Sequence, residues 1–277
     1  MSNLVRHDWT LEQLQGLHQL PLFDLLDQAR ATHLAHFAKN ELQLCTLLSV
    51  KTGGCPEDCG YCAQSSRHHK SPVVPQAMLD VPAVLSAARR AKEQGATRFC
   101  MGAAWRAVKD GPAFEKVLEM IRGVKSEGLE ACVTLGMLTA DQAARLKAAG
   151  LDSYNHNIDT SREHYPNVIT TRTFDQRLET LRHVRKAGIG ICCGGIIGMG
   201  ESLDDRCRML IELSSLDPHP ESVPINSLVA IPGTPLEHVQ KLDPLDVVRM
   251  IATTRIVLPT SRVRLAAGRE QLGREGQ

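Results

Sequence analysis

Apolar residues recur along this chain with two periods, one typical of helices and the other of strands. Helical spacing, with apolar residues at i, i+3, i+4 and i+7, occurs at 81–88 and 114–121, and the segment 10–38 predicts one or two further helices. Short apolar runs that predict strands lie at 44–50, 97–102, 129–135, 151–157, 189–197, 222–229 and 262–267. These seven strand candidates alternate with helices, which predicts a βα repeat and a parallel sheet.

The predicted helices carry signals at both ends. N-terminal caps are predicted at Asp80, Thr139, Thr173 and Asp243. Four helices end with a cation followed three residues later by a glycine, and these glycines are Gly95, Gly128, Gly150 and Gly188. A strand candidate follows each glycine directly, so each marks the passage from a helix to the next strand.

The sheet is either a closed barrel or an open, doubly wound sheet. No G-x-G-x-x-G or P-loop spacing follows any strand candidate, and the glycine-rich segment 194–200 fits neither pattern. Polar residues and cysteines lie instead near the ends of many different strands, which is how barrels place their sites. We therefore predict an α/β fold of the TIM-type (β/α) barrel kind.

Length, charge and cysteine content narrow the class of protein. A chain of 277 residues can form one large domain or two small ones, and a formal net charge of +1 favours neither nucleic acid nor an anionic membrane as a partner. No apolar run reaches about 18 residues, so no membrane span is expected, and the first residues lack the apolar core of a signal peptide. Nine cysteines then indicate metal or redox chemistry in a reducing compartment, and we expect a cytoplasmic protein.

Three cysteines at C-x3-C-x2-C spacing, Cys55, Cys59 and Cys62, are the strongest candidate metal ligands. Gly53, Gly54 and Pro56 exclude regular structure here, so a loop can fold the three thiolates around one centre. Thiolate clusters bind zinc or iron–sulfur clusters, and three thiolates on a four-iron cluster would leave one iron open. The spacing alone leaves an iron–sulfur cluster, zinc and unliganded thiols as alternatives.

Strand alternation assigns further polar and sulfur residues to shared faces. Cys100, Cys132 and Cys192 lie on three different strands, where convergent thiolates would form a second metal site. The alternative is that each is a small buried apolar residue, as free cysteines often are. Only one of the adjacent Cys192 and Cys193 can face inward, and Cys45 and Cys207 fall outside the pattern and are expected to be structural.

Asn155, Asn157 and Asp159 share another face. Two amides and a carboxylate make a hydrogen-bonding wall for a polar ligand, unless this segment is only a turn at the end of a strand. Arg262 and Arg264 also share a face, and Arg264 could simply pair with a carboxylate. The segment 194–201 could likewise be a plain turn capped by Ser202, although its glycines would allow a ligand close to the backbone.

Two sets of motifs resemble known enzymes. The three-cysteine loop, with Tyr61 directly before its last cysteine, resembles the signature of the radical S-adenosylmethionine (SAM) superfamily. Five segments resemble the biotin synthase family: Cys55-Pro-Glu-Asp-Cys59-Gly-Tyr-Cys62-Ala-Gln-Ser, Arg98-Phe-Cys100-Met-Gly-Ala-Ala-Trp105, Tyr154-Asn-His-Asn-Ile-Asp-Thr160, Ser222-Val-Pro-Ile-Asn226 and Val263-Arg264-Leu-Ala-Ala-Gly-Arg-Glu270. The resemblance runs from about residue 9 to residue 271.

This resemblance implies a radical SAM sulfurtransferase that inserts sulfur into dethiobiotin to form biotin. Cys55, Cys59 and Cys62 would hold a 4Fe-4S cluster whose open iron chelates SAM. Cleavage of SAM would release a 5′-deoxyadenosyl radical, which takes hydrogen from two unactivated carbons of dethiobiotin. Cys100, Cys132, Cys192 and Arg264 would hold a 2Fe-2S cluster that donates the sulfur, and no catalytic residue beyond these cluster ligands is implied.

Contacts to the two small molecules and to partners are implied in the same way. The SAM site would comprise Tyr61, Gly102, Ala103, Asn157, Asp159, Gly194, Ile196 and Glu201. The substrate site would comprise Lys51, Asn155, Asn157 and Asn226. A flavodoxin- or ferredoxin-like electron donor is implied, and so is a homodimer.

The expected organisation is an N-terminal helical segment at 1–40 followed by the barrel at 41–271. The family pattern continues into another strand and helix, whereas residues 272–277 do not resemble it, so we expect a barrel without its last strand and helix. Three alternatives stay open: a truncated chain that binds clusters or SAM without turnover, another radical SAM enzyme with an auxiliary cluster, and a zinc-binding thiolate protein.

Overall fold

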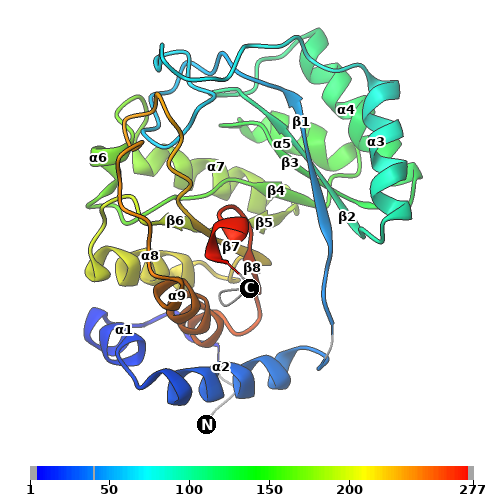
Figure 1. Ribbon diagram of the computed structural model, residues 1–277. Helices are drawn as coiled ribbons and strands as arrows, with labels where there is room; N and C mark the ends of the chain where they lie inside the picture. Colours follow the sequence, from blue (N-terminus) through cyan, green and yellow to red (C-terminus); the bar gives the residue numbers. More distant parts are fainter. Residues whose placement is uncertain (1–4, 40, 274–277) are drawn as a thin grey trace.

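A curved parallel sheet with helices around its outside forms the body of the protein (Figure 1). The computed structural model describes residues 5–39 and 41–273. Its strands are β1 (Cys45–Lys51), β2 (Arg98–Ala103), β3 (Glu130–Thr134), β4 (Ser153–Asn155), β5 (Gly190–Cys192), β6 (Gly195–Ile197), β7 (Ser222–Ser227) and β8 (Arg262–Leu265). They follow one another around the sheet in chain order, except that β6 and β8 both pair with β7. The predicted βα repeat and TIM-type fold are confirmed.

The helices lie between successive strands and in front of the first one. They are α1 (Leu11–His18), α2 (Leu22–His36), α3 (Val81–Glu93), α4 (Pro112–Ser126), α5 (Ala140–Ala148), α6 (Tyr165–Val168), α7 (Phe174–Lys186), α8 (Leu203–Ser215) and α9 (Pro244–Val257), with a 3₁₀ turn at η1 (Arg269–Leu272). Among the described residues, none of these helices has the length and apolar character needed to cross a membrane.

The cap signals in the sequence are confirmed. The side chains of Asp80, Thr139, Thr173 and Asp243 each accept a hydrogen bond from a backbone N–H in the first turn of the following helix. The four helix-ending glycines all have positive φ, between 70° and 96°. Because these local signals agree with the strand pattern, the chain enters each strand at a defined residue, and the strand ends are placed accordingly.

The N-terminal helices pack against the end of the barrel. Leu25 and Ala29 of α2 form a small apolar cluster with Ala252 of α9. His18, the last residue of α1, hydrogen-bonds through Nδ1 to Thr253 Oγ1 at 3.1 Å. The predicted division at residues 40 and 271 stays a prediction, and residues 274–277 of the predicted tail lie outside the described residues.

The first and last strands of the sheet are joined by side chains. Within the part of the chain that the structure describes, no backbone ladder links β1 to β8. Arg262 of β8 pairs with Glu41 at 2.8 Å, and Arg264 Nη1 donates to Cys45 Sγ at 3.1 Å. The barrel is therefore open as a sheet, with polar contacts across the opening near the start of β1.

The predicted strand at 189–197 is interrupted in the middle. Cys193 N donates to Ser222 O at 2.9 Å, whereas Ile196 N donates to Asp159 O at 2.7 Å, so the backbone changes partners between β5 and β6. At the change, Gly194 lies so close to β7 that a Cβ would overlap Pro224 O. The single long strand was a wrong prediction, because apolar pattern does not reveal such a close backbone approach.

Alanine at Gly194 should therefore destabilise the fold by about 1–3 kcal/mol, since the backbone of β7 cannot move aside cheaply. Alanine at Gly16, which has open space around it in the middle of α1, should instead stabilise by about 0.5–1 kcal/mol. Chemical denaturation of the two variants measures both effects. Equal stability of the two variants would show that the approach of Gly194 to Pro224 is not close.

Candidate active site

A cavity of about 340 Å³ lies where the three-cysteine loop meets the carboxyl ends of β2, β3 and β4. Its lining comes from that loop and from the strand ends, and includes Cys55, Cys59, Tyr61, Cys62, Gln64, Gly102, Ala103, Thr134, Asn155, Asn157 and Asp159. Arg172, in the segment before α7, and Arg177, near the start of α7, complete the wall. In parallel barrels the carboxyl ends of the strands are where ligands bind, so this cavity is the candidate active site.

The three-cysteine loop is held in shape by backbone hydrogen bonds. Cys55 N donates to Gln64 O at 2.9 Å, and Ser66 N donates back to Cys55 O at 2.7 Å. A tight turn between Cys59 and Cys62 is closed by a 2.9 Å bond from Cys62 N to Cys59 O. The positions of the thiols therefore depend on the backbone of the loop rather than on contacts of the sulfur atoms.

Asp58 ties this loop to the segment in front of α7. Its carboxylate accepts hydrogen bonds from the backbone N–H groups of Thr170 at 3.0 Å and Thr171 at 3.2 Å, and from both hydroxyls. Burial alone would raise the pKa of Asp58, but these hydrogen bonds outweigh it and lower the pKa to about 2.

Replacing Asp58 with asparagine should cost about 1 kcal/mol and increase proteolysis of the loop, because a charged acceptor of several hydrogen bonds is lost. In the parent, a carboxylate with a lowered pKa stabilises the folded state above its unfolded pKa of about 4, and this stabilisation disappears as the pH falls from about 4 to about 2. Proteolysis rates of parent and variant should thus converge at low pH. A constant difference down to pH 2 would contradict the role of Asp58.

The three thiols of the loop fit an iron–sulfur cluster by their chemistry. All three line the cavity, and Arg172 Nη2 donates to Cys59 Sγ at 3.8 Å, which helps to compensate thiolate charge. Burial raises the pKa of Cys59 to about 12 and also raises those of Cys55 and Cys62, so a metal must displace protons to bind. No three metal-ligating side chains in residues 5–39 and 41–273 are close enough to hold one ion, whereas the thiolates on a four-iron cluster each bind a different iron.

The predicted wall of amides and carboxylate is present on one side of the cavity. Asn155 Nδ2 donates to Asn157 Oδ1 at 3.2 Å, and Thr134 Oγ1 donates to Asn155 Oδ1 at 3.1 Å. Gly194 N donates to Asn157 Oδ1 at 3.1 Å. These contacts fix the orientation of both amides before any ligand arrives.

Asp159 is the centre of a buried charged network. Tyr61 Oη donates to Asp159 Oδ2 at 2.8 Å, and Arg177 forms an ion pair with the same oxygen. Asp159 has a left-handed backbone, with φ of 69°, a conformation that aspartate tolerates better than most residues. Burial lowers the pKa of Arg177, but the Asp159 carboxylate more than offsets this and raises it. Arg177 also donates to Asn157 O at 2.6 Å and to Tyr165 Oη at 2.8 Å, so it is held on three sides.

Buried polar atoms at the cavity wall indicate a polar ligand. Among the described residues, His156 Nε2 has no hydrogen-bond partner, while Glu57 Oε1 and Arg172 Nε have only long ion-pair contacts, with Arg106 at 3.4 Å and with Glu57 Oε2 at 3.9 Å. Burial, with the charges of Arg177 and Arg172, lowers the pKa of His156 well below its ordinary value, so its imidazole is neutral. Buried polar atoms almost always have partners, so this wall fits a ligand with several polar groups.

A second group of thiols lies on the strands one step before the cavity lining. Cys100 of β2 and Cys132 of β3 are aligned in register on neighbouring strands. Cys192 of β5 accepts a hydrogen bond from Asn155 Nδ2 and donates one to Ser222 Oγ, each at 3.4 Å. The buried Cys193 faces the apolar core instead. Gly102, Thr134 and Asn155, each two residues beyond Cys100, Cys132 and Ser153, line the cavity, so the thiols lie deeper in the barrel.

Arg264 and Cys45 contact each other at the opening between β8 and β1. Arg264 Nε donates to Ser222 Oγ at 2.6 Å, Nη1 donates to Cys45 Sγ, and Nη2 donates to Gln43. The structural role predicted for Cys45 and Cys207 stays a prediction: Cys45 contacts Arg264, and Cys207 of α8 is buried in the apolar core.

Among the described residues, five of the predicted ligand contacts are not part of the cavity lining: Lys51, Gly194, Ile196, Glu201 and Asn226. Lys51 Nζ donates to Gly53 O at the start of the loop. Glu201 accepts from the backbone N–H groups of Gly198 and Met199, and so shapes the glycine-rich turn. Asn226 connects β6 to the segment after β8, through Gly195 O and Ala267 N, both at 3.0 Å.

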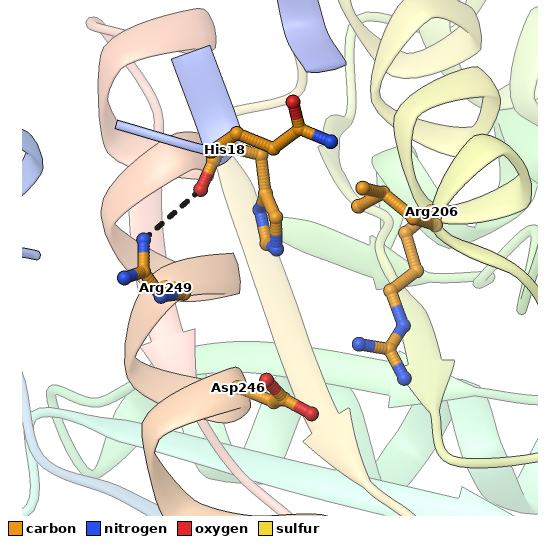
Figure 2. A pocket seen from close by; sticks show the side chains of 6 residues that line it. His18, Arg206, Asp246 and Arg249 are labelled. Carbon is orange, nitrogen blue, oxygen red and sulfur yellow. Dashed lines mark hydrogen bonds between the residues drawn. The ribbon is translucent and has the colours of Figure 1, made fainter. Parts of the chain in front are cut away.

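A separate cavity of about 370 Å³ lies between α1, α8 and α9, and Figure 2 shows its residues. His18, Arg206, Asp246 and Arg249 line it, and none of them was predicted as a site residue. Arg249 donates to the carbonyls of His18 at 3.1 Å and Leu20 at 2.7 Å, where α1 ends, and Arg206 pairs with Glu201. These contacts join the N-terminal helices to the barrel, which is a structural role.

Sequence reasoning missed the two arginines of the active site. Arg177 lies on the apolar face of α7 together with Phe174, Leu178 and Leu181, all of them buried. A charged residue at a position where helical spacing requires an apolar one is the signal that could have found it. Arg172 precedes the helix and carried no comparable signal.

Comparison with known protein families decides the identity of this site. Residues 49–213 match the Radical SAM superfamily, and residues 224–277 match the Biotin and Thiamin Synthesis associated domain. The biotin synthase of Sorangium cellulosum is 67% identical over 98% of this chain and 78% of its own length. That of Synechococcus is 62% identical over 99% of this chain and 84% of its own length. The chain belongs to the biotin synthase family.

Solved structures agree on the fold. Methylornithine synthase superposes with a TM-score of 0.78 at 20% identity, covering 92% of this chain and 74% of that one. The FeFe-hydrogenase maturase of Carboxydothermus hydrogenoformans superposes with a TM-score of 0.79 at 21% identity, covering 97% and 64%. At such identities the likeness concerns the fold alone.

Membership of the biotin synthase family makes this chain a radical SAM sulfurtransferase. The superfamily uses a 4Fe-4S cluster and SAM, and the three-cysteine loop has the donor set for that cluster. A small-molecule substrate and a redox partner follow from the same membership.

Proposed function

We propose that this chain inserts sulfur into dethiobiotin to form biotin. Cys55, Cys59 and Cys62 would hold the 4Fe-4S cluster, and Cys100, Cys132, Cys192 and Arg264 would surround a 2Fe-2S cluster as the source of sulfur. The observation that carries the proposal is one cavity that the three loop thiols line together with Gly102 and Thr134, which lie two residues beyond Cys100 and Cys132 on the same strands. When bound, the four-iron cluster supplies the electron that cleaves SAM.

The chain's own contribution to SAM binding would centre on Asp159. Its carboxylate is already oriented by Tyr61 and Arg177, so ribose hydroxyls would meet an acceptor that needs no rearrangement. Asn157 stands beside it, and the backbone at Gly102 and Ala103 forms the facing wall. We also assign Gly194, Ile196 and Glu201 to the edge of this site, with Glu201 acting through the turn that it holds.

Dethiobiotin would lie against the amide wall. Its ureido ring carries one carbonyl and two N–H groups, which match the amide donors and acceptors of Asn155 and Asn157. Thr134 and Gly194 fix these amides in advance, so binding loses little side-chain freedom. Lys51 and Asn226 would support the substrate site indirectly. Lys51 would do so through its hydrogen bond to Gly53 at the start of the loop, and Asn226 through its hydrogen bond to Gly195 of β6.

Three further proposals concern the surroundings of the enzyme. A flavodoxin- or ferredoxin-like protein would deliver the electron, the chain would act as a homodimer, and its location would be cytoplasmic. They rest on the resemblance to the biotin synthase family.

Anaerobic reconstitution with iron and sulfide, followed by SAM, reductant and dethiobiotin, tests the function. We expect the absorption of two cluster types, and biotin detected by mass spectrometry. Clusters without biotin would favour a chain that binds cofactors without turnover, and a colourless protein would overturn the proposal altogether. As a matched pair, Cys192→Ala should lose the two-iron absorbance whereas Cys193→Ala should keep it, because only Cys192 points to the polar interior.

A further inference from the structure

Cys45 lies on the interior face of the barrel at the start of β1. Side chains alternate along a strand, so Cys45 shares its face with Leu47 and Ser49, and both of these line the active-site cavity. Leu47 is aligned with Cys100 on the neighbouring β2. Cys45 is thus a fourth cysteine on this face, aligned with Arg98 and two residues before the position aligned with Cys100, and it is exposed at the opening of the sheet.

The side chain of Arg264 reaches Cys45 from the other end of the sheet. Its three nitrogens contact Ser222 Oγ, Cys45 Sγ and Gln43 Oε1, all of them acceptors. The polar groups thereby form a continuous series from Cys192 through Ser222 and Arg264 to Cys45. This series crosses the opening between β8 and β1.

Arginine and cysteine differ greatly as iron ligands. A guanidinium has five N–H donors and no lone pair for a metal until it loses a proton, which it resists. A thiolate is the ligand that iron–sulfur clusters ordinarily have. Cys45 Sγ and the Arg264 nitrogen that contacts it are 3.1 Å apart, so one iron could bind either of them.

We infer, on the basis of the second cluster proposed above, that Cys45 supplies a fourth thiolate to that cluster and can occupy the iron position expected for Arg264. The cluster then has two exchangeable ligands at one iron. Arg264 donates a hydrogen bond to the Cys45 sulfur when the thiolate binds, and Cys45 is the neighbouring thiol when the arginine binds.

Four chains test this exchange after anaerobic reconstitution: the parent, Cys45→Ser, Arg264→Met and the double variant. The readouts are iron and sulfide content, two-iron absorbance, and the Mössbauer spectrum. Each single variant should keep the two-iron cluster, and Arg264→Met should give a spectrum with all-sulfur coordination at both irons. Under mild chelation, the double variant should retain about one tenth or less of the two-iron cluster that the parent retains, as expected when a metal site loses a supporting group.

Controls separate this inference from the proposed function and from misfolding. Thr46 lies on the opposite face of β1, so adding Thr46→Ala to Arg264→Met should leave the amount of two-iron cluster as it is in Arg264→Met alone. Retention of the four-iron absorbance in every variant checks that the chain is folded. Cys132→Ser should lose the second cluster in any background, and its failure to do so would overturn the second cluster itself.

Two results would overturn the role of Cys45 while leaving the second cluster in place. One is loss of the two-iron cluster in Arg264→Met alone, which would mean that Cys45 cannot replace the arginine. The other is a double variant that keeps its cluster as firmly as Arg264→Met does.

Discussion

Replacing Cys59 with alanine should reduce SAM cleavage to background. The cysteine is buried in the active-site cavity, and only two of the three loop thiolates would remain for the four-iron cluster. The loop should keep its shape, because the turn at this position is closed by the backbone bond from Cys62 N to Cys59 O. The measurement is 5′-deoxyadenosine formed from SAM and reductant, together with the cluster absorbance.

Cys207→Ala is the matched control for that loss, since this cysteine is equally buried but lies in α8 within the apolar core. It should cleave SAM at the rate of the parent. Cleavage by Cys59→Ala at the parent's rate would mean that this cysteine holds no iron.

Replacing Arg177 with methionine should destabilise the protein by about 3–5 kcal/mol, because it leaves a buried carboxylate without its partner. Arg177 and Asp159 side chains are only 4% and 3% exposed, so water cannot take the place of the lost ion pair. SAM binding should weaken as well, since Asp159 would lose the group that orients it. Denaturant unfolding and SAM titration by calorimetry measure the two effects.

Arg182 on the same helix offers the comparison. Its ion pair with Glu179 is exposed, at 64% and 54%, so Arg182→Met should change stability by about 0.5 kcal/mol or less. Combining Arg177→Met with Asp159→Asn should recover part of the stability, because no unpaired charge then remains. A cost at Arg177 no larger than at Arg182 would show that the buried pair does not stabilise the fold.

Local signals in the sequence predicted the parts of this protein that depend on neighbouring residues. Cap residues and helix-ending glycines placed their elements correctly, and so did the apolar runs apart from the one at 189–197. Strand alternation assigned Cys192 and Cys193 to opposite sides. The wall of Asn155, Asn157 and Asp159 followed from the same alternation. Each depends on the geometry of one element and the residues next to it.

The parts that the sequence did not predict depend on contacts between distant segments. Cys45 is hydrogen-bonded to Arg264, 219 residues away, and no local pattern connects β1 to β8. The break at Gly194 depends on the approach of β7. Arg177 enters the active site because its long side chain extends from α7 to Asp159. Helical spacing shows only that a charged residue stands at a position where an apolar one is expected.

Deuterium transfer from dethiobiotin to SAM-derived 5′-deoxyadenosine is the most direct measurement of the proposed chemistry. It requires that both molecules lie together in the cavity between Cys59 and Asn155, within reach of one another. With dethiobiotin deuterated at the two carbons that gain sulfur, reconstituted chain should yield deuterated 5′-deoxyadenosine together with biotin. Formation of 5′-deoxyadenosine without deuterium, at a rate unchanged by dethiobiotin, would contradict this function.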